Sequence, residues 1–227
     1  MITAASITIA LSIAAALSAA AAIAADWEER RRRAFFVLKP LTTLLVIGIA
    51  ASAGPLGSLY TQCVLVALAL SLCGDIFLML EARSRDGDGA RSSDRAFIAG
   101  LVSFLLAHLA FVGAFVQDLR DPALPGWLAA VVFYAAGLLF VLLPRAGAMK
   151  APVLVYCVVL ALMVFAAAAR HESLEDAASL RAVLGALLFL VSDSLLALRR
   201  FVRRYPGAQA LILSTYWGAI GLIAWSV

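Results

Sequence analysis

Residues 58–80 read SLYTQCVLVALALSLCGDIFLML, and this stretch decides the fold class. Its 23 residues contain one charged side chain, that of Asp75. A helix of this length is about 35 Å long, which is enough to cross the roughly 30 Å hydrocarbon core of a bilayer. The stretch therefore predicts a transmembrane helix that carries a buried aspartate.

Similar apolar runs fill the rest of the chain, whose 227 residues are 64% hydrophobic with a mean hydropathy of +1.01. A soluble domain of this length lacks the polar residues to cover so much apolar surface. We predict an all-α, polytopic integral membrane bundle of about eight transmembrane helices, forming a single membrane domain over residues 1–227. The expected helices lie near 2–25, 34–52, 58–80, 96–117, 126–143, 151–169, 182–198 and 208–226.

The second run is the one with an open alternative. Lys39-Pro40 interrupts its start, so a chain of seven helices with a re-entrant segment at 34–52 is also compatible with the sequence. The Arg- and Gly-rich segment 81–95 is typical of a flexible, solvated linker.

The basic residues predict the orientation in the membrane. With eight helices, the odd-numbered loops hold fourteen Lys and Arg residues and the even-numbered loops hold three. This imbalance places the odd loops in the cytoplasm and both termini outside it, in a multi-pass protein of the cell membrane. The first run lacks a basic segment before it and is followed by Arg30–Arg33, which favours a retained helix over a cleaved signal peptide. The net charge of +4 is thus a topology signal, and no nucleic acid partner is expected.

Three cysteines, Cys63, Cys73 and Cys157, all lie inside apolar runs and show no metal-ligand spacing. We interpret them as small buried side chains and expect neither a metal site nor a cofactor.

Ionisable residues inside membrane helices are costly, so each is a hypothesis about function. Asp75 and Asp193 each lie five residues before the expected end of a helix, about 8 Å from the cytoplasmic side. Lys39 enters from the same side, whereas His108 lies near the midplane in an apolar and aromatic stripe. The structural alternatives are a polar clamp between helices for the aspartates, a Lys39 side chain that reaches the interface, and a hydrogen bond between helices for His108.

Five short motifs follow one another along the chain. They are Leu38–Thr42, Gly74–Met79, the set Phe97, Gly100, Phe104 and His108, then Gly185–Asp193 and Thr215–Ala219. In this order they resemble the motifs of the YhhN-type lysoplasmalogenase family of membrane proteins, and the resemblance covers the chain from about residue 35 to its end.

The resemblance implies an activity as well as a fold. Characterised relatives hydrolyse the vinyl ether bond of lysoplasmalogens, giving a fatty aldehyde and glycerophosphoethanolamine or glycerophosphocholine, and the family implies no metal. Three positions, Phe111, Trp217 and Ile220, depart from the family pattern. The last motif usually reads Tyr-Tyr-x-Ala-Gln, where this chain has Tyr216 to Ile220 with Trp217 as its second residue, and Phe111 stands where a tyrosine is common.

We therefore expect a membrane hydrolase with a lysophospholipid substrate, in which Asp75 and Asp193 are the catalytic carboxyl groups. Lys39, together with cytoplasmic arginines, is expected to hold the phosphate. The other expected substrate-binding residues are His108, Ser192 and Tyr216.

Cleavage of a vinyl ether needs a proton donor and a negative charge beside the developing cation. Ser192 and Ser194 flank Asp193 and could support its charge, so we expect Asp75 to be the acid and Asp193 the ionised partner. The rival hypothesis is a non-catalytic membrane protein that binds or transports a lipid or small solute, and a purely structural role for the buried charges is the third. The sequence does not predict an oligomeric state.

Overall fold

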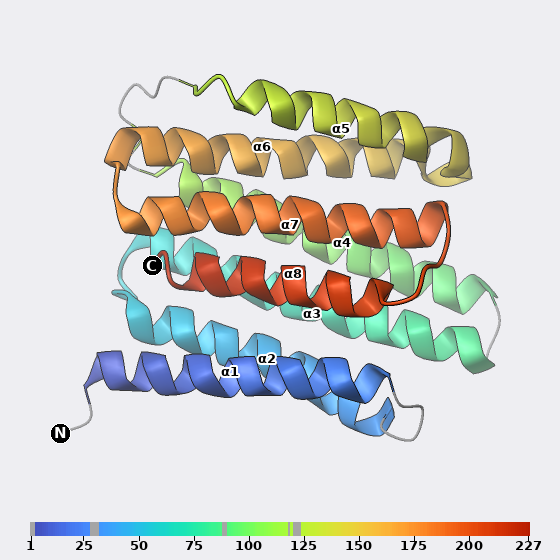
Figure 1. The fold of residues 1–227 in the computed structure, drawn as a ribbon, viewed down its shortest axis with the longest axis horizontal. Helices are drawn as coiled ribbons and strands as arrows, with labels where there is room; N and C mark the ends of the chain where they lie inside the picture. The colour runs from blue at the N-terminus through green and yellow to red at the C-terminus, as the bar shows by residue number, and fades with distance from the viewer. Residues whose placement is uncertain (1–2, 28–31, 88–89, 118, 120–123) are drawn as a thin grey trace. The chain divides into compact units, whose positions relative to one another are not determined.

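The computed structural model describes residues 3–27, 32–87, 90–117, 119 and 124–227, and within these the regular structure is entirely helical. Eight α-helices follow one another, with two short 3₁₀ turns between the fifth and the sixth (Figure 1). The helices are α1 (Ala4–Asp26), α2 (Arg32–Ala53), α3 (Leu59–Gly87), α4 (Ala90–Phe115), α5 (Leu128–Leu142), α6 (Lys150–Leu174), α7 (Ala177–Phe201) and α8 (Ala208–Ala224).

The prediction of an all-α membrane protein is confirmed. Seven of the described helices are long and apolar enough to cross a bilayer, and α8 is a shorter apolar helix of 17 residues. The re-entrant alternative for the second run is wrong, because α2 continues through Pro40. The proline ring removes one backbone hydrogen bond, a loss that membrane helices tolerate when neighbouring groups pack around it.

The prediction of a flexible linker at 81–95 is wrong for most of that segment. The helix α3 continues to Gly87 and α4 begins at Ala90, and only residues 88–89 lie outside the described part. Charged residues mark where a helix leaves the apolar core, but Glu, Ala and Arg remain good helix formers beyond it. The charge pattern therefore located the membrane boundary and not the helix boundary.

The chain divides into two compact units, Met1–Phe111 and Val112–Val227. The first contains α1, α2, α3 and most of α4, and the second contains α5, α6, α7 and α8. In each unit, helices that follow one another in the sequence pack side by side, as α1 with α2 and α7 with α8 do in Figure 1. Short connections between such neighbours make them antiparallel.

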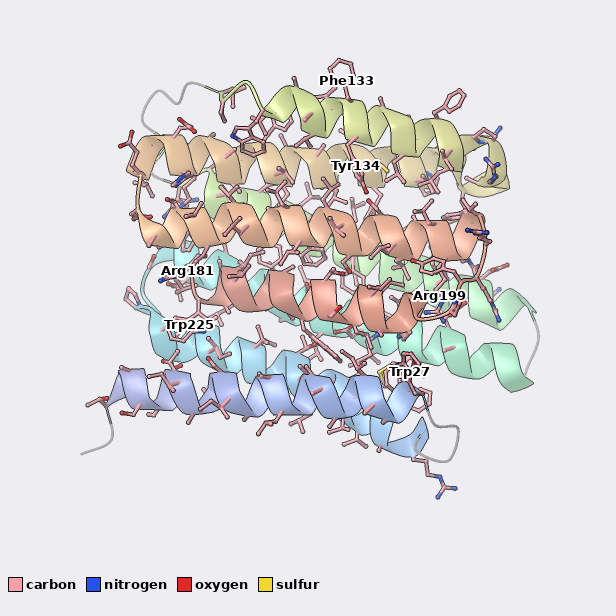
Figure 2. The ribbon with its side chains drawn as sticks, in the orientation of Figure 1. Trp27, Phe133, Tyr134, Arg181, Arg199 and Trp225 are labelled. Atoms are coloured by element: carbon pink, nitrogen blue, oxygen red, sulfur yellow. The ribbon has the colours of Figure 1, made fainter. Side chains whose placement is uncertain are left out.

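Large apolar side chains cover the outer surface of these helices. Phe133 and Phe140 on α5 are 78% and 82% exposed, and Leu17 on α1 is 68% exposed. Figure 2 shows Phe133 pointing away from the helices of its unit. Water would not favour such a surface, whereas the hydrocarbon of a bilayer does, so the protein is a multi-pass membrane protein.

The last two helices form a hairpin with polar contacts at both ends and in the middle. Arg181 in the first turns of α7 donates to the carbonyl of Trp225 over 3.2 Å, and Arg199 in its last turn donates to the Oε1 atom of Gln209. Figure 2 shows Arg181 and Arg199 at opposite ends of α7. Between them, the hydroxyl of Ser192 donates to the carbonyl of Ile212 over 3.1 Å.

Gly185 allows α7 and α8 to approach closely. A Cβ atom at this position would lie 2.6 Å from the side chain of Ile223 and 2.8 Å from the carbonyl oxygen of Ala219. The second of these contacts is with backbone, which cannot rotate away. The glycine in the Gly185–Asp193 motif therefore sets the distance between the two helices that frame Asp193.

We expect Gly185→Ala to destabilise the protein by about 1–3 kcal/mol, because overpacking forces the helices apart. Gly137→Ala on α5 is the matched control, since a Cβ atom there meets nothing within 4 Å. Thermal unfolding in detergent measures both. A Gly185→Ala variant as stable as the Gly137→Ala variant would contradict the close packing described here.

Candidate functional site

Asp75 is the centre of a buried polar cluster in the first unit. Its Oδ1 atom lies 3.1 Å from the Nζ atom of Lys39, and its Oδ2 atom accepts a hydrogen bond of 2.8 Å from the hydroxyl of Thr43. Lys39 and Thr43 are one helical turn apart on α2, so both reach the same carboxyl group on α3. All three residues are buried: Lys39 is 5% exposed, Thr43 0% and Asp75 1%.

The helix α4 packs directly beside this cluster. A Cβ atom at Gly74 would lie 2.6 Å from the ring of Phe104, so the glycine next to Asp75 is needed for the aromatic ring to fit. One turn after Phe104 on the same helix lies His108, which is fully buried. The predicted stripe around His108 is thus part of the packed interior of this unit, with Phe111 also fully buried.

Asp193 is the centre of a second cluster, in the second unit. The phenol of Tyr156 on α6 donates a short hydrogen bond to the Oδ2 atom of Asp193 on α7. Each of the two side chains is 9% exposed. This contact differs from that of Asp75 because the donor is a neutral hydroxyl and not an ammonium group.

The serines beside Asp193 do not have the role that the sequence suggested. A serine hydroxyl has one hydrogen to donate, and that of Ser192 goes to the Ile212 carbonyl while that of Ser194 goes to the Leu190 carbonyl, over 2.7 Å. The expectation that these hydroxyls support a negative charge on Asp193 is therefore wrong in this structure. Ser192 instead joins α7 to α8.

Tyr216 on α8 contacts Phe189, which lies one turn before Asp193 on α7. The two rings meet edge to face, with centroids 5.6 Å apart and an angle of 79° between their planes. Phe189 precedes Asp193 by four residues, so it occupies the same face of α7. Tyr216 and Phe189 thus form an aromatic pair one helical turn from Asp193.

The two clusters occupy equivalent positions in their units. Asp75 and Asp193 each lie 16 residues after the first residue of the third helix of the unit, α3 and α7. In each unit the donor comes from the second helix, seven residues into α2 for Lys39 and six into α6 for Tyr156. Similar positions with different donors indicate that the two carboxyl groups have different chemistry.

Thr43 and Tyr156 were missed by reasoning from the sequence. Thr43 follows Lys39 by four residues and could have been found from helical spacing alone. Tyr156 is a hydroxyl-bearing residue in the middle of an apolar run, which is itself a reason to look for a buried partner.

The model of the YhhN family matches residues 34–227. The chain belongs to the YhhN family. Both clusters lie inside the matched region, which omits only α1 and the start of α2. No solved structure matches this YhhN family chain significantly.

Several curated relatives of this YhhN chain are named lysoplasmalogenases. It is 31% identical to human lysoplasmalogenase TMEM86B over 191 residues, which is 84% of this chain and 74% of the human protein. It is 34% identical over 180 residues to the lysoplasmalogenase of Mycobacterium bovis (76% of this chain, 61% of that protein). It is 31% identical over 166 residues to bovine lysoplasmalogenase TMEM86A (72% and 64%). The chain thus spans about three fifths to three quarters of the length of these relatives.

Proposed function

We propose that this protein is a membrane lysoplasmalogenase, which hydrolyses the vinyl ether bond of a lysophospholipid. The observation that carries the proposal is the pair of buried carboxyl groups with unlike donors, in a chain whose relatives are named for this activity. The products are a fatty aldehyde and a glycerophosphoethanolamine or glycerophosphocholine.

The chemistry requires an acid first. A proton is added to the alkene carbon farther from the ether oxygen, and the adjacent carbon becomes part of an oxocarbenium ion. Water then adds to that carbon and loses a proton, and the resulting hemiacetal collapses to an aldehyde and an alcohol. A positioned acid accelerates the first step, and a nearby negative charge stabilises the cation, as in glycoside hydrolysis.

The contacts of the two carboxyl groups favour assigning these roles in the opposite way from the sequence-based expectation. Lys39 and Thr43 both donate to Asp75, and such donors stabilise an ionised carboxylate. One donor to Asp193 is a neutral phenol, which stabilises an ionised carboxylate less than an ammonium group does. We therefore propose Asp193 as the proton donor and Asp75 as an ionised carboxylate, each from the contacts within its own unit.

The described contacts support the expected roles of the other site residues to different degrees. Tyr216, through its contact with Phe189, suits a wall for the alkenyl chain, and His108 stays a proposed substrate-binding residue. The ammonium group of Lys39 is paired with Asp75, so the phosphate is not assigned to it. The hydroxyl hydrogen of Ser192 goes to the Ile212 carbonyl, so no substrate contact is assigned to that hydroxyl.

Release of a fatty aldehyde by the purified protein from lysoplasmenylethanolamine tests the proposal directly. The saturated 1-O-alkyl lysophospholipid is the matched control, because it lacks the alkene that is protonated. We expect aldehyde from the first lipid and none from the second. Binding of the lipid with no aldehyde release would overturn the proposal in favour of a binding or transport protein.

We propose that the protein lies in the cell membrane with the odd-numbered loops in the cytoplasm and both termini outside. The support is the excess of Lys and Arg in those loops. A cysteine placed at Gly87, the last residue of α3, should not react with an impermeant reagent added to intact cells. A cysteine placed at Gly57, which is exposed at the other end of α3, should react.

The three native cysteines are replaced for this measurement, so that each variant carries one thiol. Labelling of the Gly87→Cys variant from outside, without labelling of the Gly57→Cys variant, would invert the proposed orientation.

A further inference from the structure

The helix α7 carries an ordered series of chemical groups on one face. Phe189, Asp193 and Arg200 are separated by four and seven residues, which returns each of them to the same side of an α-helix. In order, they are an aromatic ring in contact with Tyr216, a buried carboxyl group and a half-buried guanidinium group. Arg200 lies about 10 Å from Asp193 along the helix axis.

This order matches that of the groups in a single-chain vinyl ether phospholipid. The alkenyl chain comes first, then the vinyl ether, then the glycerol and its phosphate. About seven bonds separate the protonated carbon from the phosphorus, or roughly 9 Å when that segment is extended. A substrate whose reactive carbon is at Asp193 and whose chain lies along Phe189 therefore places its phosphate at the level of Arg200.

The helix α6 brings a second cation to this level. Tyr156 contacts Asp193, and α6 runs antiparallel to α7. Going back six residues from Tyr156 leads to Lys150, at the start of α6, about 9 Å from the contact. Lys150 and Arg200 are therefore at the same end of the two helices. Lys150 is exposed and lies about 120° around α6 from Tyr156, so it adds positive charge at this level without facing Asp193.

The neighbouring Arg199 is unsuited to this role. It lies about 120° around the helix from Asp193, whereas Arg200 lies within about 20° of it. Both arginines make contacts within the protein, and that of Arg199 is to Gln209 on α8. Its contact closes the hairpin of α7 and α8. Of the two adjacent arginines, only Arg200 lies in register with Phe189 and Asp193.

We propose that Arg200, assisted by Lys150, binds the phosphate of the lysophospholipid and thereby sets which bond reaches Asp193. A guanidinium group holds a phosphate through paired hydrogen bonds, and Lys150 adds a point charge. The inference rests on the proposed function for the identity of the substrate. It makes Arg200 a residue that recognises the head group and not one that reacts.

The test compares Arg200→Gln with Arg204→Gln, an exposed arginine beyond the end of α7 whose loss changes the net charge equally. Both are measured with lysoplasmenylethanolamine and with 1-O-alkenylglycerol, which has the vinyl ether but no phosphate. We expect Arg200→Gln to lower kcat/KM about 10- to 100-fold for the phospholipid, the usual loss for a hydrogen bond to a charged group. The rate with alkenylglycerol, and both rates of the Arg204→Gln variant, should stay unchanged.

A binding measurement keeps the inference separate from the proposed function. The saturated 1-O-alkyl lysophospholipid and 1-O-alkylglycerol are titrated into the same variants, with no hydrolysis required. Arg200→Gln should raise Kd about 10- to 100-fold for the first ligand alone. Equal affinities of the original protein and the Arg200→Gln variant for the phospholipid would overturn the inference, even if the protein is an active hydrolase. Absence of aldehyde with a preserved Arg200 effect on binding would overturn only the proposed function.

Discussion

Asp193→Asn should abolish hydrolysis while leaving the protein folded. The amide has the shape of the carboxyl group and keeps an oxygen that accepts the hydrogen bond from Tyr156, but it has no acidic proton. A positioned acid contributes about 100- to 10,000-fold to the rate of such a step. We therefore expect a loss of that size in aldehyde release, measured at equal amounts of folded protein.

The matched control for this variant is Asp176→Asn, which replaces an aspartate at the start of the same helix. The Asp176 side chain caps α7 by accepting from the backbone N–H of Ser179 over 2.7 Å, and asparagine is an equally good cap. This variant should hydrolyse lysoplasmenylethanolamine at the original rate. A folded Asp193→Asn protein that keeps a tenth or more of the activity would remove Asp193 from the mechanism.

Lys39→Met and Asp75→Asn should each destabilise the protein by about 3–5 kcal/mol, because each leaves one buried charge without its opposite. This expectation replaces the sequence-based one, in which loss of Lys39 mainly weakens substrate binding. The double variant Lys39→Met/Asp75→Asn should regain most of the stability, since it removes both charges and the amide still accepts from Thr43. Thermal unfolding in detergent measures the three variants.

The activity of the double variant then separates function from structure. If Asp75 supplies negative charge to the reaction, the double variant should be stable and yet should not hydrolyse the substrate. Recovery of hydrolysis together with stability would instead show that Lys39 and Asp75 form only a clamp between α2 and α3.

Hydropathy and charge counts were sufficient to predict the helices, because the requirement to satisfy every backbone hydrogen bond in lipid leaves few alternatives. They failed at the segment 81–95, where α3 and α4 extend beyond the apolar residues that identified them. Helix length there depends on backbone propensity and not on the thickness of the bilayer.

Only some of the site residues could be predicted from the sequence, and the reason is different. Asp75, Asp193 and Lys39 were identifiable because a charge in an apolar run is conspicuous by itself. Their partners were not, because the pairing of Tyr156 with Asp193 joins residues 37 positions apart, and only the packing of α6 on α7 brings them together. The same packing decides that the Ser192 hydroxyl points to Ile212 and away from the carboxyl group beside it.

The polar contacts along the hairpin of α7 and α8 also bear on how the chain enters the bilayer. At 17 residues, α8 is about 25 Å long, which is shorter than the hydrocarbon core, and the donors Arg181, Ser192 and Arg199 on α7 all find their acceptors on α8 or just beyond it. An α7 inserted alone would leave the Ser192 hydroxyl, in the middle of the span, without its acceptor on α8. We therefore expect α7 and α8 to leave the translocon together.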